Sequence, residues 1–362
     1  MNILFLSSLS TTLSAGPVWS VPARILAQEK YDNVMWVNTS NADHLHWESI
    51  KSYHNISEFK SLSLNSFPIP FNRPDVVVFE GFYSGKTEYI ISKECRKFSI
   101  PYIIVPRSSL TWNAMHNKSR IKKEIVHFFF YDSFVKHSAG IQYLTEKEYL
   151  DSKYRFDYPH LILSNGIFSK DSLKKGFSKK SIKAIFIGRI DIYHKGLDIL
   201  LNACKVLYDD LLKVNFKLVL YGPKLEDYFL VEKMINDLGV SSIVSLGGEI
   251  LGENKKNAIL ESDIFILTSR FEGHPMGLIE ALSYGLPCLV TMGTNIGEEV
   301  KKYNCGFVSD ISTEGVIESL KNMIHKLNNF EEMSSNAILL ANEYDWDSLA
   351  NRFHDYLTQL IK

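Results

Sequence analysis

The sequence predicts an α/β protein made of two doubly wound domains, each a parallel sheet with helices on both faces. Short apolar runs alternate with longer amphipathic stretches along nearly the whole chain, which is typical of strand–helix–strand units. In addition, 362 residues exceed the length that one hydrophobic core usually serves, so two domains are expected.

The first half of the chain contains a series of apolar runs of strand length. They are Asn2–Leu6, Val34–Val37, Asp75–Phe79, Tyr102–Val105, Gly140–Leu144 and Leu161–Leu163. Helical periodicity is clear at Thr87–Phe98 and Arg120–Lys136. These elements define a first domain, residues 1–167.

A second series follows Phe168–Lys180, a stretch rich in Lys, Ser and Gly without periodicity, which predicts a linker. The strands expected after it are Ala184–Ile187, Lys217–Tyr221, Ile243–Leu246, Ile264–Thr268 and Cys288–Thr291. The helices expected between them are Gly196–Leu207, Leu225–Leu238, Glu253–Glu261 and Met276–Tyr284. The second domain therefore covers residues 168–345. The amphipathic run Asp347–Ile361 predicts a helix that crosses back, which assigns residues 346–362 to the first domain.

Composition excludes several classes of protein. A formal net charge of -1 gives no reason to expect a nucleic-acid partner. The four cysteines (Cys95, Cys204, Cys288 and Cys305) lack the paired spacing of a zinc or redox site, so reduced thiols in a cytoplasmic protein are expected. The apolar start is too short and lacks the basic residues of a signal peptide, and no run approaches the ~20 apolar residues of a membrane span.

The strongest motif runs from Ser269 to Thr291. Glu272 lies just before a helix that opens near Pro275, and Glu280 lies eight residues later, within that helix. Carboxylates at this spacing can contact two parts of one elongated ligand. The amides at the start of this helix, together with the helix dipole, predict a phosphate seat at Met276, Gly277, Leu278 and Ile279.

The Glu272-x7-Glu280 motif, with the Ala-Leu-Ser-Tyr-Gly-Leu-Pro that follows it, resembles the signature of retaining glycosyltransferases of family 4. The resemblance implies the GT-B fold, in which two Rossmann-like domains face a cleft. It also implies that Glu272 contacts the transferred sugar and that Glu280 binds the ribose of a nucleotide-sugar. Carboxylates suit these roles because each oxygen accepts strong hydrogen bonds from hydroxyl groups.

A second motif, from Phe186 to Ala203, places Arg189 and Lys195 at the carboxyl end of a strand. Two fixed cations can hold a diphosphate and stabilise the charge on the leaving nucleotide. The resemblance implies this role for both residues. Asp191 and His194 lie between them and could imitate metal ligands, but capping or loop roles are expected instead.

Weaker signals occur where the resemblance places other parts of the site. Gly222 and Ile250 follow strands, in loops that lie near the base in relatives. Gly16 lies between the first strand and the first helix, where relatives bring a glycine-rich loop to the donor phosphate. In relatives the segment at residue 107 carries a histidine near the reaction centre, whereas this chain has Arg107. Arg107 either reads a charged group of the donor or acceptor or pairs with an acid.

Two further segments allow alternative interpretations. Asn117–Lys136 is basic and aromatic, so it either rests on an anionic membrane surface or packs its rings inward with a solvated lysine face. Asp345-Trp346-Asp347 looks like a metal-binding motif, but its place at the start of the last helix favours an N-cap, and no metal site is predicted.

The predicted function is retaining transfer of a hexose-type sugar from a UDP- or GDP-sugar to an acceptor hydroxyl, without a cofactor or metal. The predicted acceptor is a saccharide or lipid-linked saccharide in surface polysaccharide biosynthesis, with the enzyme in the cytoplasm or peripheral at the membrane. The alternatives are a catalytically silent nucleotide-sugar-binding subunit, which the change at Arg107 leaves open, and a nucleotide-sugar epimerase of the same fold. A phosphorylase is not favoured, because no pyridoxal-lysine pattern is present.

Overall fold

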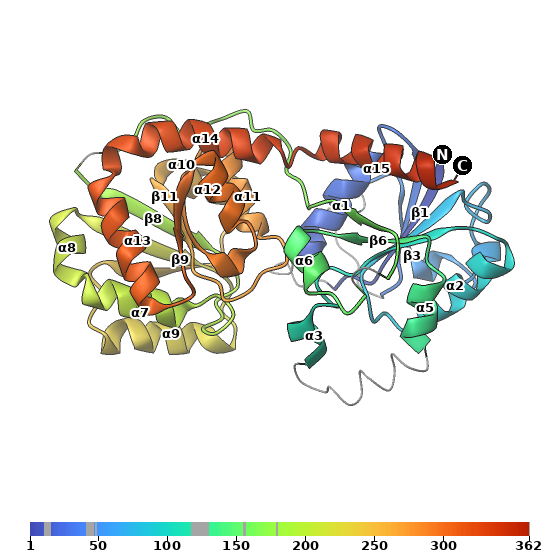
Figure 1. Cartoon of the computed structure of the whole chain (residues 1–362), viewed down its shortest axis with the longest axis horizontal. Helices are drawn as coiled ribbons and strands as arrows, with labels where there is room; N and C mark the ends of the chain where they lie inside the picture. Colours follow the sequence, from blue (N-terminus) through green and yellow to red (C-terminus); the bar gives the residue numbers. More distant parts are fainter. Residues whose placement is uncertain are drawn as a thin grey trace. The chain divides into compact units, whose positions relative to one another are not determined.

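The computed structural model describes residues 1–10, 16–40, 47, 49–116, 130–154, 157–178 and 180–361. The chain forms two compact units (Figure 1). Unit 1 consists of residues 1–166 together with 346–362, and unit 2 consists of residues 167–345. Both chain termini therefore belong to unit 1.

The sheet of unit 1 has the strand order β3-β2-β1-β4-β5-β6-β7. Its strands are β1 (Asn2–Ser7), β2 (Asn33–Asn38), β3 (Tyr53–Asn55), β4 (Val76–Glu80), β5 (Tyr102–Val105), β6 (Gly140–Tyr143) and β7 (His160–Ile162). All of its pairings are parallel over the described residues. Strand β3 was not predicted, because Tyr-His-Asn is a three-residue edge strand without an apolar run.

Helices flank this sheet. They are α1 (Gly16–Gln28), α2 (Lys86–Lys97), α3 (Trp112–His116), α5 (Asp132–Lys136), α6 (Glu146–Leu150) and α15 (Trp346–Ile361), with 3₁₀ turns at Ile56–Glu58 and Leu64–Ser66. The last helix, α15, packs against α1 (Figure 1). Its Phe353 is fully buried beneath the guanidinium of Arg24, which lies 4.3 Å from the ring centroid. The predicted return of the C-terminal helix to the first domain is confirmed.

The sheet of unit 2 has the order β10-β9-β8-β11-β12-β13 and is also parallel over the described residues. Its strands are β8 (Ile182–Ile187), β9 (Phe216–Tyr221), β10 (Val244–Gly248), β11 (Ile264–Leu267), β12 (Cys288–Thr291) and β13 (Gly306–Ser309). The edge strand β13 was not predicted, because its four residues contain only the Phe307–Val308 apolar pair. The prediction of two doubly wound parallel α/β domains is otherwise confirmed.

The helices of unit 2 lie on both faces of its sheet (Figure 1). They are α7 (Leu197–Val206), α8 (Tyr208–Lys213), α9 (Glu226–Asp237), α10 (Gly252–Glu261), α11 (Met276–Ser283), α12 (Gly297–Tyr303), α13 (Thr313–His325) and α14 (Phe330–Asn342), with 3₁₀ turns at Met292–Thr294 and Leu327–Asn329. Strand order runs outward from β8 in one direction and then from β11 in the other. Right-handed crossovers in opposite directions cover opposite faces, so α7 and α11 lie on different faces. The order reverses between β8 and β11, where ligands bind in such sheets.

The stretch predicted as a linker is fixed to unit 2. The ammonium of Lys174 lies 3.2 Å from the carboxylate of Asp263, and both side chains are buried. The ring of Phe177 packs edge-on against Phe330, with 5.7 Å between centroids. Lys174 and Phe177 of the predicted linker therefore attach it to the core of unit 2.

The predicted basic, aromatic helix lies mostly outside the described residues, which omit 117–129. At its end, α5 places Phe134 in the core of unit 1, stacked parallel to Tyr102 at 5.4 Å. None of the described helices combines the length and the apolar composition needed to cross a bilayer.

Candidate functional site

Two loops meet where the strand order of unit 2 reverses. One follows β8 and contains Lys195 and Gly196, and the other follows β11 and begins at Thr268. The hydroxyl of Thr268 donates to the carbonyl oxygens of Lys195 (3.1 Å) and Gly196 (3.0 Å). Gly196 has φ +61°, and a Cβ there would lie 2.1 Å from the carbonyl oxygen of Thr268. Only glycine permits this close approach, which joins the two loops.

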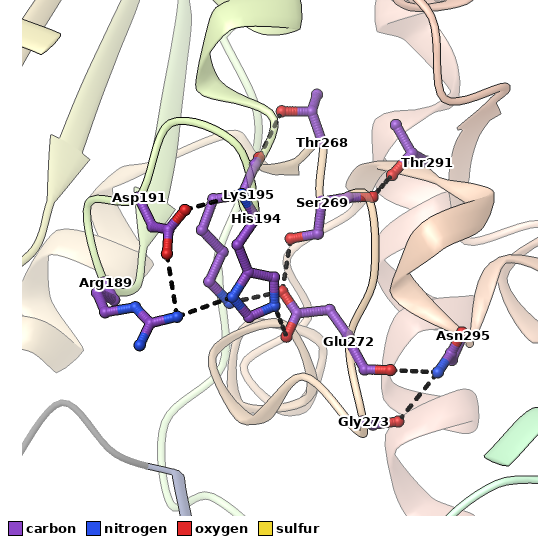
Figure 2. Close-up of polar contacts among 10 residues, drawn as sticks. All are labelled: Arg189, Asp191, His194, Lys195, Thr268, Ser269, Glu272, Gly273, Thr291 and Asn295. Atoms are coloured by element: carbon purple, nitrogen blue, oxygen red, sulfur yellow. Dashed lines mark hydrogen bonds and ion pairs between the residues drawn. The ribbon is translucent and has the colours of Figure 1, made fainter. Parts of the chain in front are cut away.

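The joined loops bring Lys195 and Glu272 into contact (Figure 2). The Nζ of Lys195 lies 2.5 Å from Oε1 of Glu272, and the hydroxyl of Ser269 donates to the same oxygen at 2.5 Å. The side chains of Lys195 and Glu272 are only 13% and 9% exposed. A largely buried carboxylate is thus held by a charged and a neutral donor, which fixes its orientation.

Arg189 joins the same cluster through Asp191 and His194 (Figure 2). Its Nη2 lies 3.1 Å from the carboxylate of Asp191 and 2.9 Å from Nδ1 of His194. The other carboxylate oxygen of Asp191 accepts from the backbone amide of His194 at 2.8 Å. Arg189 is 45% exposed, so its guanidinium remains accessible to a ligand. The loop role expected for Asp191 and His194 agrees with these contacts.

The loop that carries Glu272 is supported from β12. The side-chain amide of Asn295 donates to the backbone carbonyl of Glu272, and the hydroxyl of Thr291 donates to the carbonyl of Ser269 at 2.5 Å. On the other side, Arg270 forms a bidentate ion pair with Asp198 of α7, at 2.8 and 2.7 Å. Rigid elements on both sides therefore hold the Glu272 loop in place.

The amino end of α11 follows this loop. The amides of Leu278 and Ile279 both donate to the carbonyl oxygen of Pro275, at 3.0 and 3.1 Å. Of the four amides in the predicted phosphate seat, only those of Met276 and Gly277 make no hydrogen bond with a described residue. A Cβ on Gly277 would lie 2.8 Å from the carbonyl oxygen of Ile187, so this glycine lets α11 pack closely against β8.

Glu280 belongs to a second cluster, on the α11 face of the sheet. It forms an ion pair with Lys255 of α10, and its side chain is 21% exposed. Burial lowers the pKa of the nearby Lys170, and the negative charge of Glu280 acts in the opposite direction. Burial also raises the pKa of Tyr284. Among the described residues, no contact joins this cluster directly to Arg189, Lys195 or Glu272. Arg189, Lys195 and Glu272 thus lie in one cluster through His194, and Glu280 lies in another.

The three positions predicted to lie near the donor's base or phosphate, Gly222, Ile250 and Gly16, have different surroundings. A Cβ on buried Gly222 would lie 2.2 Å from the carbonyl oxygen of Gly188, so the close approach there is to the protein's own backbone. Ile250 is half-buried just beyond β10. Gly16 begins α1 and has open space around its Cα, because a Cβ added there would meet no described atom within 4 Å. None of these observations assigns a ligand.

Arg107 pairs with an acid. Its Nη2 and Nε lie 2.7 and 3.0 Å from Oε2 of Glu80, and its Nη1 donates to Ser20 and Asn165 at 3.1 Å. Arg24 binds the other oxygen of Glu80 at 2.7 Å; Arg24 and Glu80 are buried, and the side chain of Arg107 is 9% exposed. Burial alone would raise the pKa of Glu80, but Arg24 and Arg107 hold it below its usual range. This arrangement corresponds to the second of the two interpretations of Arg107.

The residues at the start of α15 are also engaged. Asp347 forms an ion pair with Lys30 at 2.6 Å, and Trp346 is buried. Lys30 therefore pairs with one of the two aspartates in the segment where the sequence predicted an N-cap. Among the residues that the structure describes, no group of three or more His, Cys, Asp or Glu side chains could hold a metal ion.

Sequence reasoning missed Ser269 and Asn295, which orient Glu272. Ser269 lies two residues after the end of β11, at the edge of the sheet where ligands bind, and this position is the signal that could have revealed it. Asn295 lies 23 residues after Glu272, and no local pattern connects the two. Only the neighbouring positions of β11 and β12 in the sheet bring them together.

Comparison with known proteins gives a family match within unit 2. Residues 168–340 match the family of glycosyl transferases group 1. This group 1 segment covers nearly all of unit 2 and includes Arg189, Lys195, Glu272 and Glu280. Among the curated proteins that this chain resembles is glycogen synthase of Fusobacterium nucleatum. The two are 25% identical over 218 residues, a match that covers 56% of this chain and 44% of that enzyme. The chain spans less than half the length of the first curated relatives that it matches.

Solved structures share the fold of both units. Alr3699/HepE of Anabaena, in complex with UDP and glucose, superposes with a TM-score of 0.75 at 15% identity, over 99% of this chain and 100% of that chain. WaaG, a glycosyltransferase involved in lipopolysaccharide biosynthesis, superposes with a TM-score of 0.69 at 17% identity, over 98% and 99% of the two chains. The fold is therefore that of GT-B glycosyltransferases.

Proposed function

We propose that this protein is a retaining glycosyltransferase that moves a hexose-type sugar from a UDP- or GDP-sugar to an acceptor hydroxyl. The observation that carries the proposal is the cluster of Arg189, Lys195 and Glu272 within the group 1 segment, at the point where the strand order reverses. Two cations beside one oriented carboxylate match the charges of a sugar diphosphate whose glycosidic bond is breaking.

In this mechanism Arg189 and Lys195 bind the diphosphate, together with the amides of Met276 and Gly277. Negative charge grows on the departing phosphate as the bond lengthens, so fixed cations stabilise the transition state more than the bound substrate. Glu272 binds the sugar, where positive charge develops. Glu280 binds the ribose hydroxyls, for which its carboxylate must share or release Lys255.

Retention of configuration is part of the proposal. The cluster offers no second carboxylate beside Glu272 in the role of a covalent nucleophile, since Asp191 is bound to Arg189 and to the amide of His194. Attack by the acceptor on the face that the phosphate leaves, with the phosphate assisting deprotonation, fits these residues. The two cations supply the positive charge at the diphosphate, so we propose transfer without a divalent metal.

The acceptor is proposed to be a saccharide or lipid-linked saccharide in surface polysaccharide biosynthesis. This choice is supported by the fold of WaaG, which is involved in lipopolysaccharide biosynthesis. A cytoplasmic location, with contact at the inner membrane surface through residues 117–136, belongs to the same proposal. Unit 1 is proposed to bind the acceptor and unit 2 the donor.

Thermal stabilisation by a panel of nucleotide-sugars tests the donor assignment, because a ligand that binds the native state raises the melting temperature. We expect a UDP- or GDP-sugar to stabilise the protein more than the nucleoside diphosphate alone. Release of nucleoside diphosphate that depends on an added acceptor then shows transfer. No stabilisation by any member of the panel would contradict the proposal.

One observation favours a second candidate, a nucleotide-sugar-binding subunit that does not catalyse transfer. Arg107 stands where the family resemblance places a histidine near the reaction centre. Its guanidinium donates hydrogen bonds to Glu80, Ser20 and Asn165. Binding of a nucleotide-sugar without turnover across donors and acceptors would support this candidate. An epimerase would instead convert the donor without any acceptor.

A further inference from the structure

The two carboxylate oxygens of Glu272 have different environments. Oε1 accepts from Lys195 and from Ser269, each at 2.5 Å. Oε2 makes no hydrogen bond with any residue that the structure describes, and Nε2 of His194 lies 4.0 Å from it. A carboxylate that is anchored by one oxygen presents the other as an oriented acceptor for a ligand.

The hydrogen bond from Arg189 determines the tautomer of His194. Nη2 of Arg189 lies 2.9 Å from Nδ1 of His194. A guanidinium can only donate, so Nδ1 must accept, and the imidazole proton is carried by Nε2. Burial lowers the pKa of His194, and the opposing effects of Glu272 and Asp191 do not reverse this. His194 is therefore neutral, with an N–H on the side of Glu272 (Figure 2).

The orientation of this N–H is fixed by the surrounding residues. The imidazole stacks on Phe271, with 4.3 Å between centroids and 13° between planes. The backbone of His194 is held at both ends, because its amide donates to Asp191 (2.8 Å) and its carbonyl accepts from the amide of Arg270 (2.9 Å). The Nε2–H makes no hydrogen bond with a described residue, although the ring that carries it is held by the stacking and by the backbone contacts.

We propose that His194 and Glu272 together bind one hydroxyl group of the transferred sugar. The hydroxyl oxygen accepts from Nε2–H of His194 and donates its own proton to Oε2 of Glu272. Two hydrogen bonds of ordinary length, meeting at one oxygen and ending 4.0 Å apart, enclose an angle of about 90°, which a hydroxyl oxygen accommodates. The inference rests on the proposed function and extends it, because it adds a residue that selects the donor sugar.

This arrangement predicts a particular kind of selectivity. Neither an ether nor a fluorine can donate to Oε2, and a missing hydroxyl leaves both protein groups unpaired. Sites that pair buried polar groups with a substrate hydroxyl reject analogues without it much more strongly than apolar pockets reject a change of size. One ring position of the donor sugar must therefore carry an unmodified hydroxyl.

Two substitutions separate the functions of the two imidazole nitrogens. In His194→Asn the side-chain amide reaches the place of Nδ1, so an acceptor for Arg189 remains and the donor toward Glu272 is lost. In His194→Gln the amide reaches the place of Nε2, so the donor remains and the contact with Arg189 is lost. Both variants lose the stacking on Phe271 equally, which makes each the control for the other.

Calorimetry measures the affinity for a nucleotide-sugar and the affinity for its nucleoside diphosphate. The ratio of the first affinity to the second measures how much the sugar contributes to binding. The probe is the tightest binder among UDP-glucose, UDP-galactose, UDP-N-acetylglucosamine and GDP-mannose. We expect His194→Asn to reduce this ratio about tenfold, the loss of one oriented hydrogen bond, and to change diphosphate affinity less than threefold. His194→Gln should keep most of the ratio.

A ratio that is unchanged in His194→Asn but reduced in Glu272→Gln overturns the inference and leaves the proposed function standing. No preference of the wild-type protein for any nucleotide-sugar over its diphosphate overturns both. Monodeoxy analogues of the probe supply a test that needs no folded variant. One ring position should lose about tenfold affinity for the wild-type protein, and equal affinity for all analogues would contradict the inference.

Discussion

Nζ of Lys195 lies 2.5 Å from Oε1 of Glu272, although 77 residues separate them in the chain. The ion pair connects the loop after β8 with the loop after β11 in unit 2. Both side chains are largely buried, so neither charge can be removed without leaving its partner poorly solvated. A residue proposed to bind phosphate and a residue proposed to bind sugar therefore hold each other in position.

Substitution of Lys195 by Met should slow transfer roughly 100-fold, because one fixed cation at the leaving phosphate is lost. The variant should also reduce the effect of a second substitution, Glu272→Gln, because the two side chains act as a pair. A double-mutant cycle on kcat/KM measures both effects. Strict additivity of the two substitutions would contradict the pairing.

Substitution of Glu280 by Ala should weaken binding of the nucleoside diphosphate about tenfold, equivalent to ~1.4 kcal/mol, because the ribose loses a charged acceptor. Calorimetry with UDP and GDP measures this directly. Glu253→Ala is the matched control, because this carboxylate is 78% exposed on the neighbouring helix α10. Equal affinity of Glu280→Ala and wild type would show that Glu280 does not bind the nucleotide.

Substitution of Glu80 by Gln should destabilise the protein by about 3 kcal/mol, because Arg24 and Arg107 are left as two buried cations without their counter-charge. The pKa of Glu80 is lowered in the folded state. Its stabilising contribution is therefore complete above the pKa of the unfolded chain and is lost as pH falls through the folded-state pKa.

Denaturant unfolding of wild type and Glu80→Gln, at pH 7 and at successively lower pH, checks both parts of this prediction. The difference between the two proteins should shrink in acid, because the wild-type carboxyl then becomes protonated as well. A difference that stays constant down to the lowest pH would contradict the ion-pair explanation.

Substitution of Gly196 by Ala should destabilise unit 2 by roughly 3 kcal/mol and reduce transfer. Its Cβ would lie 2.1 Å from the carbonyl oxygen of Thr268, and its φ of +61° disfavours any side chain. The resulting shift would displace the neighbouring Lys195. Thermal unfolding and kcat report the two effects.

Gly176→Ala is the control for this substitution, because Gly176 also has positive φ, +67°, but nothing lies within 4 Å of the added Cβ. It should cost only about 1 kcal/mol and leave kcat unchanged. Similar losses of stability in the two variants would show that backbone conformation, and not the contact with Thr268, determines the effect.

Much of the candidate site could be predicted from the sequence, because local patterns encode it. Arg189 and Lys195 follow one apolar strand, and Glu272 and Glu280 flank the start of one helix, so both motifs are recognisable within about twenty residues. His194 was visible only as a loop residue, because its tautomer depends on Arg189 and its neighbour Glu272 is distant in the chain. Likewise, the sequence offered two roles for Arg107, and the choice depends on Glu80, 27 residues earlier.

The sequence by itself determined the alternation of strands and helices, the point where the second series of elements begins, and the residues that carry the proposed chemistry. These properties follow from periodicity and short motifs, in which the interacting positions are close along the chain. The tertiary structure alone decided which carboxylate oxygen of Glu272 is anchored and that Glu280 pairs with Lys255. Such outcomes depend on distances between separate loops, and those distances are set by strand order and by the packing of whole helices.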